Sequence, residues 1–173
     1  KYKEIWMSEG TDIVAFLEGQ IEMLSFDESY ASKAKDHQKN LTKPLNSLGK
    51  LEEFAIWMAG WQRKIKPTMT NPHCIIFAGN HGVSNKGVSA YPSEVTAQMV
   101  ENFRSGGAAI NQLCKLAELS LSVVPIDLKN PTRDFSEELA MSEKDVIYAM
   151  QLGSDSVPED CDFLVLGEMG ISN

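Results

Sequence analysis

The sequence predicts an α/β fold in which helices flank a parallel β-sheet. Three short apolar runs, at residues 73–78, 119–126 and 161–166, have the length of buried strands. The segments between them repeat apolar residues every three or four positions, as amphipathic helices do. Strands that alternate with helices pair in parallel through right-handed crossovers, so we expect one sheet with helices on its faces.

The first 70 residues indicate helices. Residues 11–24 have apolar positions close to a 3.6-residue period, which predicts an amphipathic helix. Ser25, with Glu28 three positions on, matches a capping box, so a polar helix is expected from there to about residue 41, either solvated or packed on a partner. Pro44 ends it. A third helix, with its apolar stripe facing a core, is expected over residues 48–64.

The later elements follow from turn and cap residues. Pro92 and Ser93 open a helix, and the glycines at 106–107 separate it from another helix at 108–119. Pro125 ends the second strand or places it at an edge of the sheet. Residues 127–141 form a loop whose length is typical of functional or mobile segments. Ser142, with an aspartate three positions on, caps a helix over residues 143–152.

Composition excludes several classes of protein. The 173 residues carry a net charge of −8 and a sequence pI of about 4.9, which argues against a nucleic-acid surface. The three cysteines form no C-x-x-C pair, so we expect no metal site and a reducing, cytoplasmic location. No apolar stretch approaches the roughly 20 residues of a membrane span, and residues 1–10 lack a signal-peptide core. We expect no cofactor.

A glycine segment, Gly79-Asn80-His81-Gly82, follows the first strand. Ligand sites of α/β sheets lie beyond the carboxyl ends of the strands, which makes this segment a candidate. A histidine can act as acid or base near neutral pH, and an asparagine both donates and accepts hydrogen bonds. The alternative interpretation is that both side chains only hold the turn after the strand.

A second glycine segment, Gly167-Glu168-Met169-Gly170, follows the third apolar run, and we expect it to form a turn. Its glycines permit close approach of a ligand, and successive N–H groups there would bind an anion. Glu168 would suit a ribose hydroxyl or a ring N–H rather than a phosphate. The alternative is a simple turn with a surface glutamate.

Ser89, Tyr91, Gln98 and Met99 line either an aromatic pocket or only the core and a turn.

Five motifs, in this order, resemble the nicotinate-nucleotide:dimethylbenzimidazole phosphoribosyltransferase family. They cover residues 43–52, 77–83, 87–100, 106–111 and 167–171. The resemblance runs from about residue 10 to the end and covers roughly the N-terminal half of a family member. It implies a Rossmann-like α/β domain, a small helical domain and a cytoplasmic homodimer. We therefore expect residues 1–45 to belong to the small domain and residues 46–173 to begin the α/β domain of a truncated chain.

The resemblance also implies the reaction. A family member transfers the phosphoribosyl group of nicotinate mononucleotide to 5,6-dimethylbenzimidazole, giving α-ribazole 5′-phosphate for the lower ligand of cobalamin. Glu168 then has a supporting catalytic role, and the main base is a glutamate expected beyond Asn173. Two departures stand out, namely Asn80 where aspartate is common and Ser172 where glycine is usual. The implied substrate-binding residues are Gly79, Asn80, His81, Gly82, Ser89, Tyr91, Gln98, Met99, Gly167, Met169, Gly170 and Asn173.

Two alternatives stay open at this point. The same scaffold could transfer the phosphoribosyl group to another azole or to a phenol, because residues 89–99 do not define the acceptor. A truncated or inactive chain could instead bind a nucleotide or a partner without turnover. The sequence of the gene beyond Asn173 would discriminate between an enzyme and a binding protein, since the enzyme needs a late glutamate.

Overall fold

The computed structural model describes residues 25–173, which divide into two compact units, residues 25–70 and residues 71–173. The division falls after Thr70, so the third predicted helix belongs with the second and not with the sheet. The domain boundary at 45/46 stays a prediction for the whole protein. The helix predicted over residues 11–24 lies outside the described residues. Among the described residues, no helix has the length and apolar character that crossing a membrane requires.

The first unit is a helical hairpin of α2, Glu28–Gln38, and α3, Lys50–Gln62. The capping prediction is wrong by two residues, because Asp27 caps α2 by accepting hydrogen bonds from the N–H groups of Ser29 and Tyr30. The predicted end near residue 41 is also too late. The chain turns after Gln38, and the N–H of Lys39 donates to the Asp36 carbonyl, 3.1 Å away.

The prediction that the apolar stripe of α3 faces a core is wrong for its largest side chains. The residues that α3 buries are the small Ala59 and Gly60, together with Glu52, which is hydrogen-bonded to Lys43 and Leu48. A Cβ on Gly60 would collide with the ring of Phe26, which shows how closely the segment before α2 packs on α3. The large apolar side chains Leu48, Leu51, Phe54, Trp57 and Trp61 are exposed.

The second unit contains a parallel sheet of β1, Pro72–Ala78, β2, Ser120–Pro125, and β3, Phe163–Met169, in the order β2-β1-β3. The three predicted strands are therefore confirmed, with β1 in the centre. Pro125 lies at the end of an edge strand, as its missing N–H requires. In register, Ala78 lies opposite Pro125 on one side and Met169 on the other, so all three strands end at the same edge.

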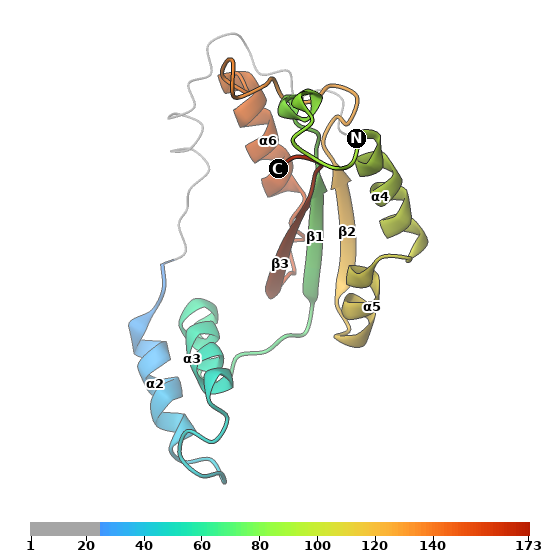
Figure 1. Cartoon of the computed structure of the whole chain (residues 1–173). Helices are drawn as coiled ribbons and strands as arrows, with labels where there is room; N and C mark the ends of the chain where they lie inside the picture. The colour runs from blue at the N-terminus through green and yellow to red at the C-terminus, as the bar shows by residue number, and fades with distance from the viewer. Residues whose placement is uncertain (1–24) are drawn as a thin grey trace. The chain divides into compact units, whose positions relative to one another are not determined.

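Helices flank this sheet, which confirms the α/β class. Helix α4, Glu94–Ser105, and helix α5, Ala109–Leu116, connect β1 to β2, and helix α6, Glu143–Asp155, connects β2 to β3. Figure 1 shows α4 and α5 on one side of the sheet and α6 on the other. The capping box of Ser142 and Asp145 at the start of α6 is confirmed.

Apolar packing between the sheet and α4–α5 forms the main core of this unit. Cys74 and Ile76 of β1 pack with Phe103 of α4, Cys114 of α5 and Ala108 just before α5. Burial, with the nearby Cys114 thiol, raises the pKa of Cys74 to about 11, so the Cys74 thiol stays protonated at neutral pH. Both cysteines therefore behave as small apolar residues.

The second glycine segment differs from its prediction. Strand β3 continues to Met169, so Gly167 and Glu168 lie within the strand and not in a turn. Gly167 is needed for packing, since a Cβ there would collide with Ile76 of β1. One face of β3, carrying Leu164, Leu166 and Glu168, is exposed, although both faces of a parallel sheet are normally covered.

Candidate functional site

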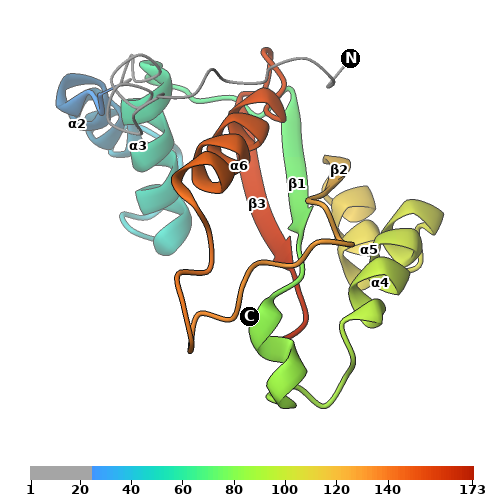
Figure 2. The same cartoon turned by 90° about the horizontal axis from the view of Figure 1, so that it is seen from above.

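The strand order creates a reversal of direction beside β1. The chain crosses from β1 to β2 on one side and then returns past β1 to β3 on the other. A reversal of strand order opens a crevice beyond the carboxyl ends of the strands beside it. This crevice is where α/β sheets bind ligands. The segments that follow β1 and β3 are the two glycine segments of the sequence, and Figure 2 shows their strands adjacent in the sheet.

The segment after β1 is held in place by the loop that follows β2. The side-chain amide of Asn80 donates to the carbonyl of Leu128 at 2.9 Å, and the carbonyl of Asn80 accepts from the N–H of Thr132 at 3.1 Å. His81 forms an isolated parallel bridge with Thr132. Gly82 is buried against the same loop, where a Cβ would lie 2.5 Å from the Thr132 carbonyl oxygen. The predicted long loop is therefore ordered against the strand end.

The segment after β3 brings a carboxylate and an imidazole together. A Cβ placed on Gly170 would lie 2.8 Å from Oε1 of Glu168, 2.8 Å from Nε2 of His81 and 2.9 Å from the carbonyl oxygen of Gly79. The side-chain amide of Asn173 donates to Oε2 of Glu168. These five residues, all predicted from the two glycine segments and the residues after them, are therefore neighbours at one edge of the sheet.

Several polar atoms at this edge have no hydrogen-bond partner. Oδ1 of Asn80, Nε2 of His81 and Oγ of Ser172 are buried and unpaired. Asn80 is 8% exposed, so its free acceptor is costly to leave unpaired. Ser172 also has a φ of 72°, in the left-handed region that glycine favours. Unpaired buried groups gathered beyond two strand ends are what a binding site for a polar ligand contains.

The predicted aromatic pocket is only partly assembled by the described residues. Ser89 and Tyr91 lie on the connection before α4, where the Ser89 hydroxyl accepts a hydrogen bond from the Tyr91 N–H at 3.2 Å, and the Tyr91 side chain is 66% exposed. Gln98 is exposed on α4. Met99 packs against the core cluster around Cys74, and Met169 packs on the same cluster from β3. A role for these residues in binding an aromatic base stays a prediction.

Sequence reasoning did not identify three residues that support this edge. Thr132 and Leu128 belong to the loop that the sequence marked only by its length. Lys86 lies on the short 3₁₀ helix η1, Gly82–Lys86, and binds the same loop through Asp134 and Glu137. No motif identifies such a lysine, because a charged surface residue is ordinary in any sequence. Within the part of the chain that the structure describes, no group of three His, Cys, Asp or Glu residues could hold a metal ion.

Comparison with known proteins agrees with this geometry. A family model described as Phosphoribosyltransferase matches residues 23–173. The chain belongs to this family. A nicotinate-nucleotide–dimethylbenzimidazole phosphoribosyltransferase from Jannaschia sp. (strain CCS1) is 48% identical over 167 residues, which are 96% of this chain and 50% of that relative. The phosphoribosyltransferase of the same name from Cereibacter sphaeroides (strain ATCC 17025 / ATH 2.4.3) is 50% identical over 143 residues, or 83% of this chain and 42% of the relative.

A solved phosphoribosyltransferase has the same fold. The crystal structure of the nicotinate-nucleotide–dimethylbenzimidazole phosphoribosyltransferase from Thermus thermophilus superposes with a TM-score of 0.78 at 33% identity. The match covers 85% of this chain and 50% of that one. This chain thus spans about half the length of the curated relatives that it matches. The Rossmann-like class inferred from the resemblance is confirmed by this likeness, together with the parallel sheet.

Proposed function

We propose that this chain is part of an enzyme that transfers the phosphoribosyl group of nicotinate mononucleotide to 5,6-dimethylbenzimidazole. The products are nicotinate and α-ribazole 5′-phosphate, the nucleotide of the cobalamin lower ligand. The observation that carries the proposal is that Glu168, His81 and Gly170 lie together at the edge of the sheet, where the strand order reverses. The relatives of this chain are named for this reaction. A carboxylate, an imidazole and a glycine at one strand edge suit a ligand with hydroxyl and phosphate groups.

The leaving group of this reaction needs no general acid, because it is already a cationic pyridinium. The bond between C1′ of the ribose and the pyridinium nitrogen breaks, and its electron pair neutralises the nicotinate ring. A benzimidazole nitrogen forms the new bond to C1′, and the N–H proton passes to a base. The resemblance assigns that base to a glutamate that is not among these residues. Glu168 is close enough to the edge to bind the ribose hydroxyls or the incoming ring.

The remaining substrate contacts are proposed from the same edge. The N–H groups after Gly170 bind the 5′-phosphate, because that glycine leaves room for an approach to the backbone. Ser89, Tyr91 and Gln98, with Met99 and Met169, receive the benzimidazole. The family resemblance further supports a homodimer in the cytoplasm, with the helical hairpin in a small domain.

The test is an assay of the full-length gene product with nicotinate mononucleotide and 5,6-dimethylbenzimidazole. We expect release of nicotinate and formation of the α-riboside phosphate, both followed by chromatography. Glu168→Gln, which keeps the size of the side chain, should lower kcat by about 10²-fold while changing nucleotide affinity less. Glu159→Gln, on the connection between α6 and β3, is the control. Absence of nicotinate release with any benzimidazole would refute the proposed function, and release with a phenol alone would change the acceptor.

A further inference from the structure

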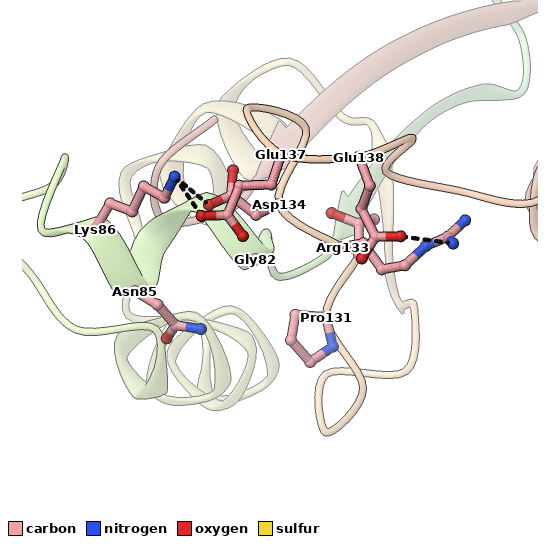
Figure 3. A pocket seen from close by; sticks show the side chains of 9 residues that line it. Gly82, Asn85, Lys86, Pro131, Arg133, Asp134, Glu137 and Glu138 are labelled. Carbon is pink, nitrogen blue, oxygen red and sulfur yellow. Dashed lines mark hydrogen bonds and ion pairs between the residues drawn. The ribbon is translucent and has the colours of Figure 1, made fainter.

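Lys86 connects the 3₁₀ helix η1 to the loop after β2. Its Nζ lies 2.8 Å from Oε1 of Glu137, 3.2 Å from Oδ2 of Asp134 and 2.8 Å from the hydroxyl of Ser136. Figure 3 shows the lysine reaching from η1 to the two carboxylates across the wall of a pocket of about 370 Å³. We call this set of contacts the Lys86 clamp.

The loop side of the clamp is itself ordered. The Ser136 hydroxyl and N–H donate to Asp134 at 2.7 and 2.9 Å and, with help from Lys86, hold the pKa of that carboxyl below its ordinary value. The Asp134 side chain is 15% exposed, although Glu137 is open to solvent. At Asp134 the lysine therefore binds a fixed acceptor, whereas its pair with Glu137 lies at the surface.

The same loop determines the position of the site residues. Five positions before Lys86, His81 forms its bridge with Thr132, and Asn80 is tied to the loop by two hydrogen bonds, one of them from its side chain. The Asn80 amide group is thereby committed to Leu128, which leaves Oδ1 as its free acceptor. A displacement of the loop would move Asn80 and His81 together.

The contribution of the Lys86 clamp to the free energy of unfolding does not by itself explain why these contacts are present. Ion pairs as exposed as that of Lys86 contribute little to the free energy of unfolding. A clamp between two connections can still fix the geometry of groups bound to both of them, and a misplacement of about 1 Å at a reacting centre is enough to cost 10²-fold in rate.

We propose that Lys86 is a positioning residue, which fixes the loop at 127–138 and through it aims the free Oδ1 of Asn80 and Nε2 of His81 at the ligand. The expected effect of Lys86 on nucleotide binding rests on the proposed function. The positioning itself does not, because it can be measured on the free protein.

The experiment compares Lys86→Met, Lys86→Arg and Lys39→Met in the full-length gene product. Lys39 is the matched control, since it too forms an exposed ion pair, with Asp36 at 2.8 Å, but in the helical hairpin. The imidazole signals of His81 are followed by ¹⁵N NMR and assigned with His81→Gln. Affinity for nicotinate mononucleotide is measured by calorimetry, and melting temperature is recorded for every variant.

We expect Lys86→Met to shift or broaden the His81 signals and to weaken nucleotide binding about three- to tenfold, with a melting temperature close to that of the parent. Lys86→Arg, which keeps the charge and the donors, should restore both properties, and Lys39→Met should change neither. Unchanged His81 signals in Lys86→Met, or no restoration by arginine, would overturn the proposal. A parent protein that binds no nicotinate mononucleotide would refute the proposed function, while the His81 signals would still decide the role of Lys86.

Discussion

Gly170 leaves no space for a side chain. Two side-chain atoms, from Glu168 and His81, and one backbone oxygen lie within 2.9 Å of where its Cβ would be. We expect Gly170→Val to weaken binding of nicotinate mononucleotide at least about tenfold, because the valine displaces these groups and blocks the phosphate from the backbone. Free benzimidazole carries no phosphate, so its affinity should change much less.

Paired titrations of nucleotide and benzimidazole measure this difference. Gly153→Val on α6 is the control, since nothing lies within 4 Å of a Cβ there. If Gly170→Val binds the nucleotide as tightly as the parent does, the phosphate lies elsewhere in the protein.

The residues of this edge were partly predictable from the sequence. The glycine segments that contain Asn80, His81 and Glu168 come close to both strand ends, and the hydrogen-bonding groups of these side chains limit which ligands they can bind. The placement of His81 and Glu168 on either side of Gly170 was not predictable, because about 90 residues separate them and only the register of β1 with β3 brings them to the same edge. The left-handed backbone of Ser172 is signalled only by the family resemblance, in which glycine is usual at this position, and not by serine itself.

At the scale of elements, Glu52 connects α3 to the chain before it. It accepts from Nζ of Lys43 at 2.7 Å and from the N–H of Leu48 at 3.2 Å, and these bonds lower the pKa of its carboxyl from 4.5. A lowered pKa in the folded state means that this stabilisation is complete above the unfolded value and is lost as pH falls through the folded one.

We therefore expect the free energy of unfolding to fall more steeply for the parent than for Glu52→Gln between about pH 5 and about pH 3. Urea unfolding followed by tryptophan fluorescence measures this, since Trp57 and Trp61 lie on α3. Glu53→Gln is the control, because the ion pair of Glu53, with Lys50 at 3.5 Å, is exposed on both sides. Parallel pH profiles for the parent and Glu52→Gln would contradict the prediction.

Local chemistry predicted most elements but not all of their limits. The Ser142–Asp145 cap and the glycines after Ser105 are predicted correctly because the signal is contained within a few residues. The extension of β3 through Gly167 was missed, since the glycine is required by Ile76 on the neighbouring strand and not by a turn. The stripe of α3 was assigned to a core because periodicity shows which residues share a face and not what covers that face.

At the scale of the molecule, the described sheet leaves one face of β3 open, with Leu166 64% exposed. The chain also spans about half of its curated relatives. We expect these 173 residues alone to release nicotinate about 10²–10⁴-fold more slowly than the Jannaschia relative, because the resemblance assigns the general base outside them. The two purified proteins are assayed side by side at saturating substrates. Similar rates would show that the base lies within this chain.

The order of the strands has a consequence for synthesis. The central strand β1 is made first, but about 90 residues separate it from β3, which covers its second edge. At ribosomal rates of about 5–20 residues per second, that interval lasts roughly 5–18 s. Until β3 is made, the edge of β1 that it covers stays unpaired, and another nascent chain could join the backbone there.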